Sequence, residues 1–277
     1  MQENTRRSRI LVTIILALVA WLTIGQGIAL LFAGRLSAYL VANTPFLILG
    51  LTLFLSIRFI IGIPIGELAS DAQPLRKKLI LHSFFLYTAL SALFLTITSV
   101  IWPASIAYTP APLAKRILFI LTALIFTPIQ TTSEEFLFRI LPTRLVQPKR
   151  LRQRWSVALF SGLLFALPHL GNREVAAAEA PWVVLLYYGL FGCVLTAISL
   201  YSGGFEIALG AHAANNLFVA IVCNYPASSL PSPSLFLSLR APGTLQDLAQ
   251  LCILLFALGL LGVSWKKKLA PSLPPAE

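Results

Sequence analysis

The chain has 277 residues, of which 57% are hydrophobic and 11% are charged. Soluble globular domains contain roughly 45 to 50% apolar residues, so the composition excludes a soluble domain and predicts an all-α, polytopic transmembrane helix bundle. The net charge of +11 does not indicate a nucleic-acid partner, because the basic residues lie between apolar stretches, as in the cytoplasmic loops of membrane proteins. The expected partner is the lipid bilayer.

Eight apolar stretches approach the roughly 20 residues that a tilted helix needs to cross a bilayer. In chain order they cover residues 10–32, 45–63, 79–102, 113–132, 155–170, 181–201, 205–224 and 245–265. We therefore predict a single transmembrane domain over residues 10–265, with its motif core at 132–216. A cytoplasmic N-terminal segment (1–9) precedes this domain, and a cytoplasmic C-terminal tail (266–277) follows it.

The placement of Lys and Arg predicts the orientation of the chain. These residues are concentrated at 6–9, 76–78, 144–154 and 266–268, whereas the alternate loops carry few of them. The positive-inside rule therefore favours both termini in the cytoplasm and an even number of spans. The Pro-rich and Ser-rich stretch at 225–243 is expected to be a loop on the opposite side.

Three ionisable residues, Glu134, Glu135 and Arg139, follow the fourth apolar stretch within an otherwise apolar segment. Charged groups at membrane depth are costly and are usually functional. Glu135 and Arg139 are four residues apart, with the acid first, which is the favourable order for an ion pair on a helix. Glu134 is turned by about 100° from Glu135. Glu134 is therefore the carboxylate that we expect to be free to act as a general base.

Two of the three histidines lie in other apolar stretches. His169 ends the segment that begins at Phe165, and Pro168 before it is expected to place His169 just beyond the end of a helix. His212 and Asn216 are four residues apart and share a helix face. The two imidazoles are thus presented from separate helices, as a site in the core of a bundle requires.

These residue types suggest hydrolysis, by either of two routes. In the first, Glu134 and His169 activate a water molecule, and His212 and Asn216 face the developing oxyanion. In the second, Glu134, His169 and His212 bind a divalent metal, with zinc as the expected ion, which itself activates the water. The sequence leaves both routes open.

The ordered trio of Glu134-Glu135-x-x-x-Arg139, Phe165-x-x-x-His169 and His212-x-x-x-Asn216 resembles the three motifs of the CAAX-protease and bacteriocin-processing intramembrane endopeptidases, the type II CAAX prenyl endopeptidase group. The resemblance implies a bundle of about eight spans and cleavage of a membrane-associated protein or peptide. It also implies a catalytic set of Glu134, His169, His212 and Asn216, with Glu135, Arg139 and Phe165 in support.

Two other classes of function are compatible with a polar cluster between helices. The chain could be a non-catalytic scaffold or an immunity-type membrane protein, in which these side chains only hold helices together. A transporter also uses intramembrane acids, but it would be expected to carry an inverted repeat, and none is visible in the sequence.

Overall fold

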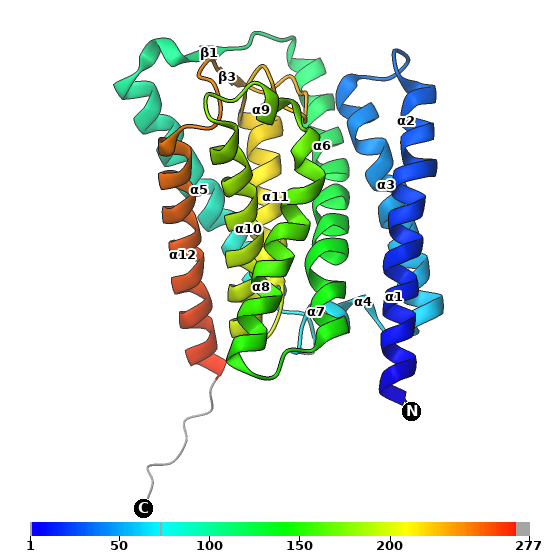
Figure 1. Cartoon of the computed structure of the whole chain (residues 1–277). Coiled ribbons are helices and arrows are strands. Elements are labelled where there is room, and N and C mark those ends of the chain that lie inside the picture. Colours follow the sequence, from blue (N-terminus) through cyan, green and yellow to red (C-terminus); the bar gives the residue numbers. More distant parts are fainter. Residues whose placement is uncertain (1, 73, 270–277) are drawn as a thin grey trace, which may run out of the picture.

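The computed structural model describes residues 2–72 and 74–269. It is an all-α bundle with very little sheet, as predicted from the composition (Figure 1). The first half contains α1 (Gln2–Ala20), η1 (Trp21–Gly25), α2 (Gln26–Phe32), α3 (Ala38–Ser56), η2 (Ile57–Ile61), α4 (Ile65–Ala69), α5 (Lys77–Ile101), η3 (Pro103–Ser105), β1 (Ile106–Tyr108) and α6 (Leu113–Glu135).

The second half contains η4 (Phe136–Ile140), α7 (Leu141–Val146), α8 (Leu151–Ala166), η5 (Leu167–Gly171), α9 (Arg173–Ala176), α10 (Pro181–Ser202), α11 (Glu206–Leu217), η6 (Phe218–Val222), β2 (Cys223–Asn224), β3 (Phe236–Ser238) and α12 (Leu245–Leu269). The segments η1, η2, η4 and η6 are single π-helical turns. Such turns are rare and often occur at functional sites.

Six helices among the described residues are long and apolar enough to cross a membrane by length and composition: Asn4–Phe32, Ala38–Ile61, Lys77–Ile101, Leu113–Val146, Pro181–Ser202 and Leu245–Lys267. The other two predicted spans, 155–170 and 205–224, correspond to the shorter helices α8 and Glu206–Val222. The structure therefore supports an integral membrane protein, with two of the eight predicted stretches shorter than a typical span.

The predicted end of the fourth span at residue 132 is wrong. The helix that begins at Leu113 continues through η4 and α7 to Val146. The boundary was set by the charged residues that follow, but Glu135 and Arg139 neutralise each other inside the bundle, so they do not end the helix. Glu134 consequently lies about 12 residues from the end of a continuous helix, or roughly 18 Å along its axis.

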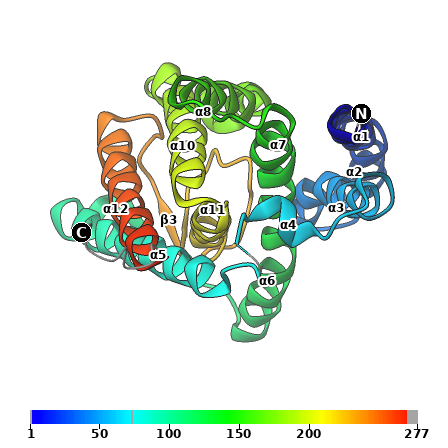
Figure 2. The same ribbon diagram turned by 90° about the horizontal axis from the view of Figure 1, so that it is seen from below.

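Helix α11 lies in the middle of the bundle, with α5, α6, α8, α10 and α12 around it (Figure 2). Its first residue, Glu206, is fully buried and pairs with Arg76, which donates from Nε at 2.9 Å and from Nη2 at 2.7 Å. Arg76 also donates to the carbonyl of Ser202 at 2.8 Å. The ion pair ties the start of the central helix to the segment before α5.

Helices α8 and α10 pack closely because glycines face each other between them. A Cβ atom at Gly162 would lie 2.7 Å from the Gly189 carbonyl oxygen, and one at Gly192 would lie 2.8 Å from the Gly162 Cα. Small residues of this kind allow membrane helices to approach backbone to backbone. The close approach fixes α8, and the η5 turn after it, against α10.

A small sheet covers one end of the bundle, in the order β1-β3-β2. Strand β3 pairs antiparallel with β1 and parallel with β2, and α9 lies at the same end (Figure 1). The sequence analysis expected the segment at 225–243 to be only a loop. Its strand was missed because the pairing is with residues far away in the chain.

The start of α1 and the last turn of α12 both lie on the side of the bundle opposite the sheet (Figure 1). This arrangement agrees with an even number of crossings. Which end faces the cytoplasm stays a prediction, as do the boundaries of the terminal segments. Helix α12 extends into the predicted tail as far as Leu269, and the remainder of that tail lies outside the described residues.

Candidate active site

Glu134 and His212 face each other across the centre of the bundle. Both side chains are buried, Glu134 near the end of α6 and His212 in α11. The Nε2 atom of His212 lies 3.5 Å from Oε2 of Glu134. The two groups can therefore share a proton or hold one water molecule between them.

Glu135 holds His212 from the other side. The Nδ1 atom of His212 lies 2.7 Å from Oε1 of Glu135, and the same carboxylate forms an ion pair with Arg139. When Nδ1 carries the ring proton and donates it to Glu135, Nε2 is the unprotonated nitrogen, and it is the one that faces Glu134. The sequence predicted the pair of Glu135 and Arg139, which is confirmed, but it did not predict that Glu135 also orients His212.

Arg139 is fully buried and lies against aromatic rings. Its guanidinium carbon is 4.2 Å from the centre of the Phe165 ring and 5.3 Å from that of Phe191, and Nη2 donates to the Phe191 carbonyl at 3.4 Å. The Phe165 ring also contacts the edge of His212, with ring centres 5.4 Å apart. Phe165 thus packs against both the cation and the imidazole of the site.

His169 lies in the 3-10 turn η5, beyond the end of α8 at Ala166, as expected from Pro168. Its Nδ1 atom is 2.7 Å from the Phe165 carbonyl oxygen. Its ring stacks on Tyr188, with the ring centres 4.0 Å apart. These two contacts fix the ring and leave Nε2 as the nitrogen available for chemistry.

Asn216 follows His212 by one turn of α11. Its Oδ1 accepts a hydrogen bond from Nδ2 of Asn215 at 2.9 Å, and Oδ1 of Asn215 accepts from the Tyr87 hydroxyl at 2.8 Å. Because the carbonyl oxygen of Asn216 is occupied, its Nδ2 amide is the group left to donate to a ligand.

All four residues expected to be catalytic line one cavity of about 300 Å³. Within the part of the chain that the structure describes, His212 forms the imidazole contact to Glu134, and no ion-pair contact joins Glu134 to His169. The sequence analysis had paired Glu134 with His169. Spacing along one chain does not tell which of two imidazoles on separate helices lies nearer.

Several cavity residues were missed by the sequence analysis. Gln130 precedes Glu134 by one helical turn and lines the same cavity, and its Oε1 atom is buried without a hydrogen-bond partner. Trp21 and Gln26 come from the first helical segment, and Glu174 comes from α9. The four-residue spacing to Glu134 was a usable signal for Gln130. No local pattern points to the residues from the N-terminal helices.

The candidate metal ligands are Glu134, His169 and His212. Among residues 2–72 and 74–269, no group of three His, Cys, Asp or Glu side chains is arranged to hold a metal ion. The side chains of Glu134, His169 and His212 as placed here therefore do not form a ready three-ligand site.

The comparisons with known proteins concern the segment that carries these residues. Residues 113–218 match the family model described as type II CAAX prenyl endopeptidase Rce1-like. This segment is therefore similar to that family. It includes every residue of the three motifs, so the resemblance stated from the motifs is supported for residues 113–218.

One curated relative is the Bacillus subtilis (strain 168) protein named "Uncharacterized protein YyaK". It is 32% identical over 170 residues, which cover 61% of this chain and 55% of the relative. The chain thus matches a little over half the length of this relative. No solved structure matches the chain.

Proposed function

We propose that the protein is an intramembrane endopeptidase that hydrolyses a peptide bond of a membrane-associated protein or peptide. The observation that carries the proposal is the arrangement of Glu134 and His212 Nε2, 3.5 Å apart in a cavity, with Glu135 behind the imidazole. A carboxylate, an imidazole and a second carboxylate that orients it form a proton-transfer unit of the kind that general acid–base catalysis requires. The match of residues 113–218 to the Rce1-like family model supports the same reaction class.

In the proposed reaction, Glu134 removes a proton from a water molecule held between it and His212. The resulting hydroxide adds to the carbonyl carbon of the substrate, and the carbonyl oxygen becomes an oxyanion. The Nδ2 amide of Asn216 is the donor proposed to stabilise that charge. Nδ1 of His169 donates to the Phe165 carbonyl, so Nε2 of His169 is an acceptor and can take up a proton during the reaction. The proton then passes to the amide nitrogen, the carbon–nitrogen bond breaks, and the two peptides leave as an acid and an amine.

A metal-assisted version of the reaction remains a separate proposal. Glu134, His169 and His212 have the chemistry of a His₂Glu zinc site, and a bound zinc ion would lower the pKa of its water. Among the described residues these side chains are not grouped as a ligand set, and the steps given above use the side chains of the protein alone. Activity that survives prolonged treatment with a chelator would favour the metal-free reaction, and activity restored only by zinc would favour the metal.

We also propose that the substrate enters from the end of the bundle opposite the chain termini. The cavity extends from Glu134 to Asn172 and to the loop residues Ser228 and Ser229, at the end covered by α9 and the small sheet (Figure 1). If the termini are cytoplasmic, as the basic residues predict, this entrance faces away from the cytoplasm. The proposed substrate then presents its cleaved bond at the outer face of the membrane.

The decisive experiment uses the full chain reconstituted in liposomes with a membrane-anchored peptide library. Glu134→Gln and His212→Ala should each lower hydrolysis at least 100-fold, whereas Glu67→Gln, at an exposed acid of α4, should leave it unchanged. Thermal unfolding of each variant reports whether the bundle is intact. If folded Glu134→Gln and His212→Ala proteins cleave as fast as the native sequence, the protease proposal fails and a scaffold role becomes the better account.

A further inference from the structure

Basic and aromatic side chains from three helices gather at the end of the bundle where the described chain begins and ends. Lys78 and His82 lie in the first two turns of α5, and Tyr201 lies in the last turn of α10. Trp265 and Lys266 lie near the end of α12. Figure 2 views the bundle from this end and shows α12 next to α5. We call these five residues the basic–aromatic cluster, and none of them lines the proposed active site.

Contacts between side chains join the cluster across the helices. Nζ of Lys266 lies 4.1 Å from the centre of the Tyr201 ring. The rings of Trp265 and His82 lie beside each other, with their centres 5.7 Å apart. Nδ1 of His82 donates to the carbonyl oxygen of Lys78, which is one turn earlier on the same face of α5. Lys78 and Lys266 are therefore presented from two helices that meet at one place.

The positive charge at these helix ends is not neutralised by the described part of the protein. Four exposed lysines form no ion pair within residues 2–72 and 74–269: Lys77, Lys78, Lys266 and Lys267. Two acids at the same end, Glu206 and Asp71, are already paired with Arg76 and Arg144. The partner that this charge attracts is therefore an anion from outside the chain.

The surroundings of the cluster favour an anion that carries hydrocarbon. Helices α5 and α12 are both long and apolar enough to cross a membrane, and the lysines lie at their ends. Beyond the cluster, these helices expose apolar side chains, among them Leu81, Phe85 and Leu260. Trp and Tyr are enriched where lipid head groups meet the acyl chains. A ligand that fits this place has a negative charge at head-group depth and apolar chains beside it.

We propose that the basic–aromatic cluster binds the phosphodiester head group of an anionic phospholipid. Lys78 and Lys266 attract the phosphate from two helices, and the acyl chains follow the exposed apolar faces of α5 and α12. Basic sites between transmembrane helices bind head groups of this kind. Such binding concerns the lipid around the protein and does not depend on proteolysis.

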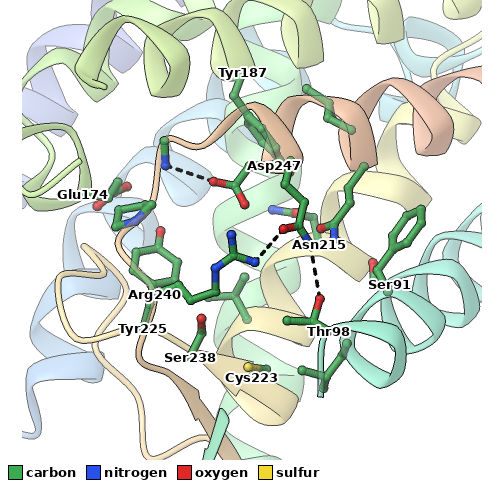
Figure 3. Close-up of a pocket in the computed structure, with 18 of the residues that line it drawn as sticks. Ser91, Thr98, Glu174, Tyr187, Asn215, Cys223, Tyr225, Ser238, Arg240 and Asp247 are labelled. Atoms are coloured by element: carbon green, nitrogen blue, oxygen red, sulfur yellow. Dashed lines mark hydrogen bonds between the residues drawn. The ribbon is translucent and has the colours of Figure 1, made fainter. Parts of the chain in front are cut away.

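The proposed lipid site is separate from the cavities of the protein. A second cavity of about 310 Å³ is lined by α5, α10, α12 and the sheet end of the chain, and Figure 3 shows Thr98 and Asp247 beside it. Thr98 follows Lys78 by about 20 residues of α5, or roughly 30 Å along the helix axis. No residue of the cluster lines this cavity or the cavity that holds Glu134. The lysines can therefore be replaced without a change to the groups proposed for hydrolysis.

Native mass spectrometry of the full chain in detergent measures the affinity for the first bound lipid. The probes are phosphatidylglycerol and phosphatidylcholine with identical acyl chains, because phosphatidylcholine has the same phosphodiester without a net charge. The native sequence should bind phosphatidylglycerol at least tenfold more tightly than phosphatidylcholine. Each lysine beside an anionic lipid contributes about fivefold to binding, so Lys78→Gln/Lys266→Gln should weaken the binding of phosphatidylglycerol at least tenfold and leave that of phosphatidylcholine unchanged.

Arg152→Gln/Arg154→Gln is the matched control, because it removes two exposed cations from α8 rather than from the helices of the cluster. It should bind phosphatidylglycerol within about twofold of the native sequence, and thermal unfolding shows that each variant is folded. An equal loss of binding in both double variants would overturn the proposal, because it would reveal only a general attraction to positive charge. Equal affinity of the native sequence for the two lipids would also overturn it. Displacement of phosphatidylglycerol by an equal concentration of glycerol 3-phosphate would identify a site for a soluble phosphate ester, and the lipid assignment would be wrong.

Discussion

Removal of one member of the Glu135–Arg139 pair is predicted to destabilise the bundle far more than removal of both. Both side chains are fully buried, and loss of one partner leaves an uncompensated buried charge at a cost of about 3 to 5 kcal/mol. The other close contacts of Arg139 among the described residues are a carbonyl at 3.4 Å and an aromatic face at 4.2 Å, and neither is an anion. Glu135→Leu and Arg139→Met should each lower Tm by an amount on the order of 10 °C.

The double variant Glu135→Leu/Arg139→Met separates stability from activity. Replacement of a buried pair by apolar residues of similar volume is often neutral for stability. Glu135→Leu also leaves Nδ1 of the buried His212 without its acceptor, at a cost of about 1 to 3 kcal/mol. The double variant should therefore be destabilised by about that amount, which is less than either single variant. Hydrolysis should still fall at least tenfold, because His212 loses the carboxylate that orients its Nδ1 atom 2.7 Å away. Unfolding would be followed by scanning fluorimetry in detergent, and cleavage would be expressed per folded molecule.

Two outcomes would refute this reasoning. In the first, the free-energy losses of the two single variants add up to the loss of the double variant. This result would show that the ion pair contributes net stability, rather than only offsetting the cost of burying its two charges. A double variant with full activity would show that Glu135 has no part in positioning His212.

Three further predictions follow from other parts of the structure. Gly162→Leu should lower the free energy of unfolding by about 1 to 3 kcal/mol through overpacking between α8 and α10, whereas Gly189→Ala, where an added Cβ meets nothing within 4 Å, should be nearly neutral in the same denaturation assay. Burial raises the pKa of Glu174, but the hydrogen bonds to its carboxylate outweigh this effect and hold the pKa below the ordinary value. The stability that the ionised carboxylate contributes is therefore present above about pH 4.5, and it is lost as the pH falls through the pKa that Glu174 has in the folded protein. Glu174→Gln should flatten that part of the curve of Tm against pH. Gln130→Leu should reduce kcat/KM roughly tenfold, because a polar group one helical turn from Glu134 is lost from the cavity wall. Its Tm should stay equal or rise, because the buried Oε1 atom that is removed has no hydrogen-bond partner. A fall in Tm with unchanged kinetics would contradict this prediction.

The sequence predicted the parts of this structure that depend on residues close together in the chain. The all-α class followed from composition, and the pairing of Glu135 with Arg139 followed from their four-residue spacing. Pro168 correctly predicted that His169 lies beyond the end of a helix. Each of these features is set by local backbone geometry or by the cost of burial.

The rest of the site depends on contacts between distant segments. The orientation of His212 by Glu135 joins residues 77 positions apart, and the wall formed by Trp21 comes from the first membrane helix. The end of the fourth span was misplaced because each charged residue, taken alone, favours the end of a membrane span. In the folded bundle Glu135 and Arg139 form a buried ion pair, so the helix continues past them. Such features require the packing of helices, which a single sequence does not specify.

Both described ends of the chain lie at the end of the bundle away from the sheet (Figure 1). An affinity tag or a fluorescent protein at either terminus would therefore stand far from both cavities and leave their entrances clear. An antibody fragment raised against the sheet end would do the opposite and block access. The molecule thus offers one end for immobilisation and the other for screening inhibitors, and the two can be used in a single binding assay.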